Sequence, residues 1–265
     1  MSRADGNGWT LACADSLLWL HAAETESVDA VVTDPPYSSG GQHRGDRTAA
    51  TSAKYQNSDS AIEYPEFNGD TRDQRGYLAW CSLWLAEAWR ITKPGGVGIV
   101  FTDWRMLPTA TDAFQAGGWV WRGIVPWTKP GARPHLGRFT ASCEFAIWGS
   151  KGPMPNDRGV GVLPGFIEAI PVRSDVRQHL TEKPESVMRK LVQIVPAGGL
   201  ICDPFAGSGT TGVAALLEDR RFVGVEMSAE YHRIACDRLR ALENLEHRRD
   251  AERGQAGLFT TEPKR

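Results

Sequence analysis

Two short stretches contain residues that could do chemistry together. In "VVTDPPYSSGG" (31–41), Asp34 ends a hydrophobic run and is followed by Pro35, Pro36 and Tyr37. Because the prolines restrict the backbone, they would present the carboxylate, a carbonyl and the ring at fixed angles. A carboxylate that only ends a strand in a turn is the simpler alternative.

The chemistry that fits this first stretch is methylation of an amino group on a nucleobase. Such an amine is a poor nucleophile because its lone pair is delocalised into the ring. If Asp34 and the Pro35 carbonyl accept its two N–H groups, the lone pair can point at a methyl donor and the developing positive charge is stabilised. Tyr37 would stack on a base that has left the double helix.

The second stretch, "DPFAGSGTTG" (203–212), satisfies the pattern G-x-G-x-x-G. It follows an expected strand and opens an expected helix, and Glu226 ends the next strand. In this setting glycines let a ligand approach the backbone, and the acid pairs with ribose hydroxyls. No lysine follows the glycines, which excludes a phosphate-binding P-loop. A tight turn with no ligand is the alternative.

The position of the glycine loop limits the ligand. Too few residues follow Gly212 for the second half of a dinucleotide-binding fold, so a compact nucleoside is expected. Asp203 would suit a ligand that carries an ammonium group. S-adenosylmethionine meets both demands, and a dinucleotide oxidoreductase is disfavoured.

The elements that must position these residues alternate between strands and helices, which favours a mostly parallel sheet covered by helices. Strands are expected at 28–33, 97–103, 119–129, 143–151, 200–203 and 221–226. Helices are expected at 77–92, 107–116, 181–195, 210–218 and from Ser228 to about residue 248. The connection between 119–129 and 143–151 leaves no room for a crossover helix, so these two strands should be antiparallel.

Together the two stretches resemble motifs IV and I of the amino-group DNA methyltransferases, in the order of the permuted β-class. Further similar segments are "CADSLLWL" (13–20), "WRITKPGGVGIVF" (89–101), "WTKP" (127–130), "CEFAIWGSKG" (143–152) and "HLTEKP" (179–184). The resemblance implies a Rossmann-like class I methyltransferase fold. It also implies transfer of a methyl group from S-adenosylmethionine to adenine N6 of a flipped-out base, as in restriction–modification. Methylation of cytosine N4 is the alternative, and methylation of RNA or of a protein amide is the next one. In this family an aspartate before Pro-Pro-Tyr, as at Asp34, rather than a serine, favours adenine.

The resemblance also implies the site residues. The catalytic set is Asp34, Pro35, Pro36 and Tyr37. The cofactor set is Asp15, Lys183, Asp203, Phe205, Ala206, Gly207, Gly209, Thr210 and Glu226. Within it, Asp15 would face the cofactor adenine and Glu226 the ribose. Lys183 would pair with the cofactor carboxylate, unless it is only an exposed charge before Pro184.

The expected organisation is one catalytic domain over residues 1–248 with a charged tail at 249–265. Two inserts interrupt it: a mobile loop at 38–76 and a small target-recognition region at 151–178. Residues 122–190 carry eleven basic and six acidic side chains in a chain of net charge −2, which suits a DNA-facing surface. The expected DNA contacts are Arg133, Arg138, Arg158, Arg173 and Arg177, and surface solvation is the alternative for each.

Composition narrows the remaining classes. The five cysteines are scattered without a CxxC pair, which argues against a zinc site or a disulfide framework and favours a reducing cytoplasm. No apolar run is long enough to span a membrane. Double-stranded DNA is the expected partner, and the sequence leaves open a homodimer and a restriction endonuclease partner. A non-catalytic DNA-binding module is a further alternative, which the intact Asp34 and Tyr37 disfavour.

Overall fold

The structure is a computed structural model that describes residues 2–37, 72–132, 134, 136–172 and 183–258, with residues 246–258 described by their backbone alone. The strands are β1 Ser2–Gly6, β2 Trp9–Cys13, β3 Val28–Thr33, β4 Thr92–Thr102, β5 Val120–Thr128, β6 Cys143–Ser150, β7 Ile167–Glu168, β8 Leu200–Asp203 and β9 Arg221–Glu226. The helices are α1 Ser16–Ala22, α4 Gln74–Ile91, α5 Leu107–Ala116, α6 Glu185–Val192, α7 Thr210–Leu217 and α8 Ala229–Leu258.

The described strands form one sheet in the order β1-β2-β9-β8-β3-β4-β6-β5-β7. Its centre, from β2 to β4, is parallel. The strands β5 and β6 pair antiparallel to each other, and β6 pairs antiparallel to β4. The sequence-based prediction of a mostly parallel sheet with an antiparallel pair is therefore confirmed. Because β3 and β8 are parallel neighbours, the residues that follow them meet at one edge of the sheet.

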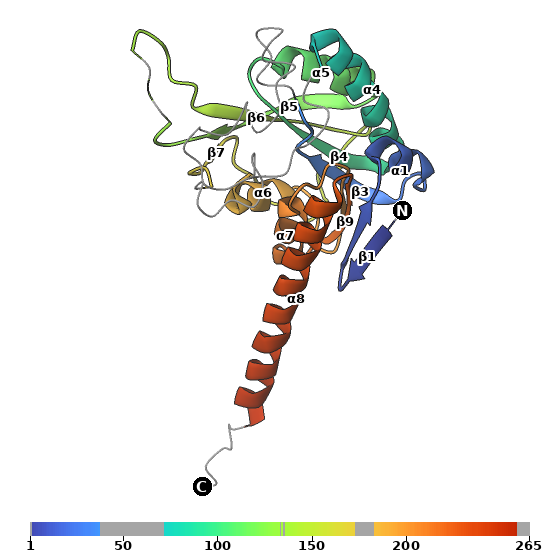
Figure 1. Ribbon diagram of the computed structural model, residues 1–265, viewed down its shortest axis with the longest axis vertical. Helices are drawn as coiled ribbons and strands as arrows, with labels where there is room; N and C mark the ends of the chain where they lie inside the picture. The colour runs from blue at the N-terminus through green and yellow to red at the C-terminus, as the bar shows by residue number, and fades with distance from the viewer. Residues whose placement is uncertain (1, 38–71, 133, 135, 173–182, 259–265) are drawn as a thin grey trace.

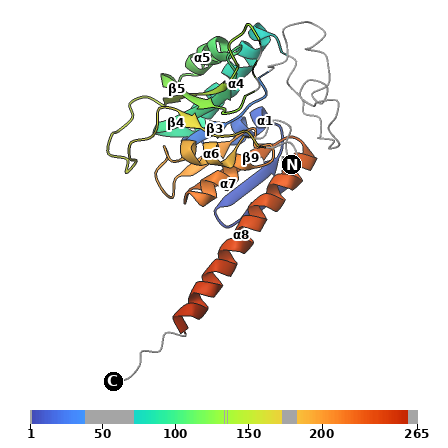
Figure 2. The same ribbon diagram turned by 90° about the vertical axis from the view of Figure 1, so that its left-hand side faces the viewer.

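Helices cover both faces of the sheet, giving three layers (Figures 1 and 2). On one face α1, α4 and α5 pack through Leu20, Trp84 and Phe114, which are fully buried. On the other face α6, α7 and the first turns of α8 pack through buried residues such as Met188 and Leu239. Within the described residues, no helix is both long and apolar enough to cross a membrane.

The strand β4 begins earlier than its sequence predicts. The helix expected at 77–92 ends at Ile91, just before "KPGG" (93–96), and these four residues belong to a bulged part of β4. The register passes from Val28–Thr92 directly to Ala30–Val97, which leaves the four residues between as the bulge. The backbone of Lys151 pairs with both glycines there, at 2.8 Å to Gly95 and 2.9 Å to Gly96. This tertiary pairing overrides the local preference of proline and glycine.

Two further elements differ from expectation. The N-terminal strands β1 and β2 form a hairpin that was not predicted, and β2 extends the sheet beside β9. The last helix was expected to fray after about residue 248, whereas α8 continues to Leu258 and projects away from the other elements (Figure 1). The expected tail at 249–265 is thus helical as far as Leu258.

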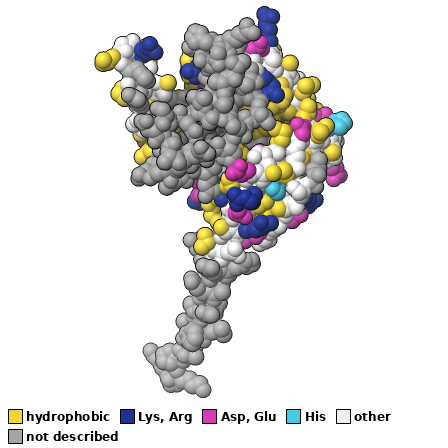
Figure 3. All heavy atoms as spheres, viewed as in Figure 1, with side chains coloured by type: hydrophobic (Ala, Val, Ile, Leu, Met, Phe, Trp, Pro, Cys, Tyr) yellow, Lys and Arg dark blue, Asp and Glu magenta, His cyan; other side chains and the backbone are white. Residues whose placement is uncertain are grey.

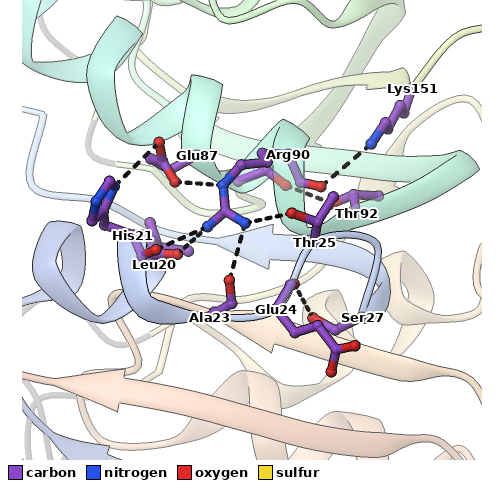
Figure 4. A network of polar contacts seen from close by, with 11 residues as sticks. Leu20, His21, Ala23, Glu24, Thr25, Ser27, Glu87, Arg90, Thr92 and Lys151 are labelled. Atoms are coloured by element: carbon purple, nitrogen blue, oxygen red, sulfur yellow. Dashed lines mark hydrogen bonds and ion pairs between the residues drawn. The ribbon is translucent and has the colours of Figure 1, made fainter.

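The end of α4 is fixed to the connection between α1 and β3 by Arg90 (Figure 4). Its guanidinium group donates to the carbonyls of Leu20 at 2.7 Å and Ala23 at 3.0 Å, and to the Thr25 hydroxyl at 2.8 Å. Its Nε donates to Glu87 at 2.8 Å. One side chain therefore binds several carbonyl groups at the end of α1, of which the Leu20 carbonyl also accepts a 3.2 Å hydrogen bond from the Ala23 backbone.

Candidate active site

The two stretches singled out in the sequence lie side by side at the carboxyl edge of the sheet. Asp34 follows β3 and the glycine loop follows β8, and these strands pair in parallel with Val31 opposite Cys202. The hydroxyl of Thr33 donates a 2.6 Å hydrogen bond to the Asp203 carboxylate, which joins the stretches directly. A ligand at this edge can therefore contact both of them.

The carboxylate of Asp34 is held on one side only. Its Oδ2 lies 2.5 Å from the ammonium group of Lys183. Its Oδ1 is buried and has no hydrogen-bond partner among the described residues. A buried acceptor without a donor is uncommon in folded proteins, and it marks a place where a ligand could supply the missing donor.

Lys183 connects Asp34 with the antiparallel strands. The lysine is 5% exposed, and its ammonium group also lies 3.3 Å from Glu144 of β6. Glu144 in turn pairs with Lys129, just after β5, and accepts a 3.2 Å hydrogen bond from the Tyr37 hydroxyl. Three segments far apart in the sequence thus form one cluster, here called the catalytic cluster: Asp34, Tyr37, Lys129, Glu144 and Lys183.

The charges of the catalytic cluster shift one another's proton affinity. Burial raises the pKa of Asp34, and Lys183 opposes part of this rise. Burial acts to lower the pKa of Lys183, but Asp34 and Glu144 outweigh it, so this pKa is raised. Burial acts to raise the pKa of Glu144, but the two lysines outweigh it and lower this pKa. The lysine between the carboxylates therefore keeps its proton.

The buried position of Lys183 corrects one interpretation of the sequence. The interpretation of Lys183 as an exposed, solvated charge is wrong, because its side chain is enclosed and paired with two carboxylates. Pairing with a cofactor carboxylate stays a prediction. The partner found here, Asp34, precedes Lys183 by 149 positions, so no local pattern pointed to it.

The glycine loop is organised around Glu226, at the end of β9. One oxygen of its carboxylate accepts a hydrogen bond from the Gly207 backbone and the other from the Ser228 backbone, both at 2.8 Å. Burial raises the pKa of Glu226, and the backbone donors oppose the rise. Each oxygen has a further lone pair, so this carboxylate can still accept hydrogen bonds from a pair of hydroxyl groups.

Asp203 lies beneath the loop and is 2% exposed. It accepts hydrogen bonds from the hydroxyls of Thr33 and Thr211, both at 2.6 Å, and from the backbone of Phe205 at 3.0 Å. Burial raises its pKa to about 6, and these donors oppose the rise. The carboxylate thus organises the loop from below, and direct pairing with a ligand ammonium group stays a prediction.

The other predicted loop residues fall into two groups. Gly209 has a φ of +83°, and an added Cβ would lie 2.9 Å from the Cβ of Ala235 in α8, so close packing requires this glycine. Thr210 is buried and accepts a hydrogen bond from Arg238 at 3.1 Å. Phe205 and Ala206 lie at the turn itself. The ring of Phe205 packs at 5.2–5.4 Å against two tryptophans of α4, Trp80 and Trp84.

Asp15 lies at the same edge of the sheet. It is the N-cap of α1, and its side chain accepts a 2.9 Å hydrogen bond from the backbone of Leu18. The next residue, Ser16, donates to the Pro204 carbonyl, and Ala14 donates to the Glu226 carbonyl at 3.1 Å. The exposed carboxylate of Asp15 therefore stands beside both the glycine loop and Glu226.

The arginines expected to contact DNA are placed in different ways. Arg138 is exposed in the connection between β5 and β6. Arg158 instead donates to the carbonyls of Pro155 and Ile194, each at 3.2 Å, which favours a structural function for it. Arg133, Arg173 and Arg177 lie outside the described residues, as does the expected mobile loop up to residue 71. The second insert, the expected target-recognition region at 151–178, contributes β7 beside β5.

Several site residues were not predicted as such: Thr33, Lys129, Glu144, Thr211 and Arg238. Lys129 and Glu144 lie in "WTKP" and "CEFAIWGSKG", where each is a charged residue near the end of a mostly apolar strand. A charge at such a position is unusual unless it is paired, and this signal could have identified them. Arg238 binds Ser208 and Thr210 from α8, and nothing in its local sequence marks it.

Comparison with known proteins gives a family match over most of the chain. A family model described as a DNA methylase, covering N6 and N4 methyltransferases, matches residues 28–161 and 158–237. Among curated relatives, the type II methyltransferase M2.DpnII of Streptococcus pneumoniae is 27% identical over 261 residues, which cover 89% of this chain and 91% of that protein.

Solved structures share the fold. The M1.HpyAVI–SAM complex superposes with a TM-score of 0.61 at 23% identity, covering 87% of this chain and 98% of that one. The cytosine-N4-specific PvuII DNA methyltransferase superposes with a TM-score of 0.63 at 18% identity, covering 86% of this chain and 85% of that one. The expected class I methyltransferase fold is therefore confirmed.

Proposed function

The chain belongs to the family of DNA methylases that modify the N6 amino group of adenine or the N4 amino group of cytosine, and from this premise we propose that it methylates adenine N6. The methyl donor is S-adenosylmethionine, and the substrate base is one held outside the double helix. The observation that carries the proposal is the buried Oδ1 of Asp34, which has no donor in the described part of the chain and lies at the edge where the two stretches meet.

Asp34 orients the amine in this mechanism. Its Oδ1 accepts one N–H of the exocyclic amino group, the Pro35 carbonyl accepts the other, and the nitrogen lone pair turns toward the donor methyl group. Lys183, at 2.5 Å from Oδ2, holds the carboxylate in place from the opposite side. As the N–C bond forms, positive charge on the nitrogen is stabilised by the carboxylate. The raised pKa of Asp34 suits it to take the proton that the nitrogen then loses.

Tyr37 supplies the stacking surface for the everted base. Its hydroxyl is fixed by Glu144 at 3.2 Å, and the Lys183 ammonium group lies 5.4 Å from the ring centroid. Stacking on a ring that is already held requires little ordering when the base arrives. Glu144 is thus a positioning residue for both Tyr37 and Lys183.

The residues present fit S-adenosylmethionine, which supplies an electrophilic methyl group when bound. Glu226 has lone pairs available for the two ribose hydroxyls, and Asp15 stands exposed beside it for the adenine. The partly buried ring of Phe205 forms an apolar wall, backed by Trp80 and Trp84. Direct evidence that such a fold holds this molecule comes from the M1.HpyAVI–SAM complex.

Cytosine N4 is the second candidate, because the same geometry serves either amino group and a cytosine-N4-specific enzyme shares the fold. The acid at position 34 favours adenine. By analogy with the type II methyltransferase M2.DpnII, we assign the biological role to restriction–modification.

The test is a transfer assay that reads the product. The protein is incubated with unmethylated DNA and S-adenosylmethionine labelled in its methyl group, and the DNA is digested to nucleosides for mass analysis. Labelled N6-methyladenine is the expected product. N4-methylcytosine would move the assignment to the second candidate. Parallel incubations offer RNA or protein in place of DNA, and label that appears only in those incubations would overturn both candidates.

A further inference from the structure

A projecting loop leaves the catalytic cluster and returns to it. The loop comprises residues 129–142 between β5 and β6, of which residues 133 and 135 lie outside the described residues. It begins at Lys129 and ends two positions before Glu144, and both of these residues belong to the catalytic cluster. Figure 1 shows this connection extending beyond the rest of the molecule at the upper left. With six or seven residues in each arm, it can reach up to about 20 Å from the cluster.

The end of this loop presents two large apolar side chains to solvent. Leu136 and Phe139 are each 103% exposed, so they touch almost nothing in the described part of the protein. Single exposed apolar residues are normal, but a leucine and a phenylalanine that stand out completely and together usually mark a contact surface. Figure 3 shows hydrophobic and basic side chains together at this projecting end.

The charge of the loop favours a polyanion as the partner. Its sequence, "KPGARPHLGRFTAS", contains Lys129, Arg133 and Arg138 but no aspartate or glutamate. Arg138 lies between the two apolar residues and is exposed. Proteins that bend or open DNA commonly insert an apolar side chain between base steps while neighbouring basic residues hold the phosphates.

The backbone of the loop is shaped by turns. The ladder of β5 and β6 continues to a 2.8 Å hydrogen bond from Lys129 to Ser142, and a turn closes from Ala132 back to Lys129 at 3.3 Å. Gly131 and Gly137 have φ values of +76° and +70°, where glycine is favoured. Leu136 and Phe139 thus flank a glycine turn, which separates and presents them.

We infer that the tip of this loop, residues 136–139, enters the DNA beside the target base, and that Leu136 and Phe139 insert into the base stack while the base is everted. This inference rests on the proposed function for the identity of the partner. An apolar wedge would help to open the duplex, and its connection to Lys129 and Glu144 places the opening next to Asp34 and Tyr37. A second copy of the chain is a poorer partner for this loop, because two basic loops that face each other would repel. The surface that two side chains can bury is also far smaller than the interface of a stable dimer.

The test compares duplex and single-stranded DNA. The variant Leu136→Ser/Phe139→Ser is compared with wild type and with Leu83→Ser/Val120→Ser, a control that changes two exposed apolar residues on α4 and at the start of β5. We expect the loop variant to lose at least about tenfold in methyl transfer to duplex DNA, since opening a base step is worth a few kcal/mol. On the same DNA after heat denaturation, the loss should stay within about threefold, because no stack has to be opened. The control variant should match wild type on both.

A second measurement does not need catalysis. Closed circular plasmid is relaxed by topoisomerase I in the presence of each protein, and the topoisomers are resolved on a gel. Because wild type unwinds the DNA during relaxation, it should leave topoisomers with a lowered linking number after the protein is removed, and the loop variant should not. Sedimentation of both proteins at the assay concentration tests the second-copy alternative.

The outcomes separate the two proposals. Equal activity of the loop variant and wild type on duplex DNA, equal loss on duplex and denatured DNA, or no unwinding by wild type would each overturn insertion. Dissociation of a wild-type dimer by the variant would assign the loop to self-association instead. If wild type transfers no methyl group to any DNA, the proposed function fails, and the unwinding result still decides whether the loop enters DNA.

Discussion

The ammonium group of Lys183 lies 2.5 Å from the carboxylate of Asp34, although the two residues belong to different motifs and are 149 positions apart in the chain. The lysine is enclosed between Asp34 and Glu144, and its pKa is raised by both. The carboxylate of Asp34 is therefore held on one side by an ammonium group that keeps its proton. In the proposed transfer reaction, this relationship gives Lys183 the function of a positioning residue.

Removal of Lys183 should change the pH dependence of catalysis. In Lys183→Met the buried carboxylate of Asp34 loses its counter-charge, so its pKa, already raised by burial, should rise further. The carboxylate is needed in its ionised form, and activity is lost as pH falls through this pKa. We therefore expect the acid limb of the kcat profile to move to higher pH by about one unit or more.

The same variant distinguishes the two interpretations of Lys183. If the lysine positions Asp34, the Kd for S-adenosylmethionine should change little, as measured by calorimetry. If it binds the cofactor carboxylate, this Kd should rise at least about tenfold, as expected when one partner of a buried charged pair is removed. An unshifted acid limb with normal kcat would contradict the positioning function.

Asp34 itself should be required for transfer and dispensable for cofactor binding. Asp34→Ala removes the acceptor, and Asp34→Asn keeps its shape but presents no full charge to the developing cation. We expect kcat to fall at least roughly a hundredfold in both, as for loss of a transition-state hydrogen bond. The cofactor Kd should stay within a few-fold of wild type. Near-normal turnover in the asparagine variant would show that the charge of Asp34 has no catalytic function.

Asp203 should make the protein less stable as pH rises. Burial raises its pKa from 3.8 to about 6, so the folded state binds this proton more tightly than the unfolded state. The group's favourable contribution is complete below pH 4 and is lost as pH rises through about 6. Asp203→Asn has an amide in place of the carboxyl group, so it cannot bind this proton. Its unfolding free energy relative to wild type should therefore increase between pH 4 and 7 by roughly 2–3 kcal/mol, as measured by urea denaturation. A constant difference between the two proteins at all pH values would contradict the raised pKa.

Arg90 should matter for stability and not for chemistry. Arg90→Met removes the guanidinium donor to the Ala23 carbonyl and one of two donors to the Leu20 carbonyl, so we expect the unfolding free energy to fall by roughly 1–3 kcal/mol. The hydrogen bonds of Arg90 lie near the start of β4, at the edge of the sheet opposite Asp34. Turnover at a temperature well below unfolding should therefore equal that of wild type. Arg90→Lys is the matched control, and it should recover only part of the loss because lysine lacks the planar fork.

Most of the fold followed from local patterns. The helix at 107–116 and the strand at 28–33 were predicted with the bounds that the structure has. The strand could be recognised because it is a short, β-branched and nearly continuous apolar run followed by proline. The bulge at 93–96 could not be predicted, since it depends on the backbone of Lys151 rather than on the prolines and glycines themselves. The N-terminal hairpin was also missed, because β1 is largely exposed and has no apolar face to reveal it.

The candidate site was predictable in its two motifs and not in the groups that connect them. Asp34 and Gly207 are marked by their neighbours in sequence. The contacts of Lys183 with Asp34 and of Thr33 with Asp203 each join positions about 150 or more apart. Such contacts arise from the order of the strands, and a single sequence shows only the types of residue that could make them.

The hydrogen bond from Thr33 to Asp203 joins two parts of this sheet edge: the glycine loop, proposed to bind the methyl donor, and the end of β3, proposed to bind the substrate base. It implies that binding at one part is not energetically independent of binding at the other. A ligand that tightens the turn above Asp203 also fixes the end of β3, from which Asp34 and Tyr37 are presented. Thermodynamic linkage then requires reciprocity: whatever factor the methyl donor adds to the affinity for an everted base, the base must add to the affinity for the donor. Thr33, a small and fully buried side chain, would set the size of that factor.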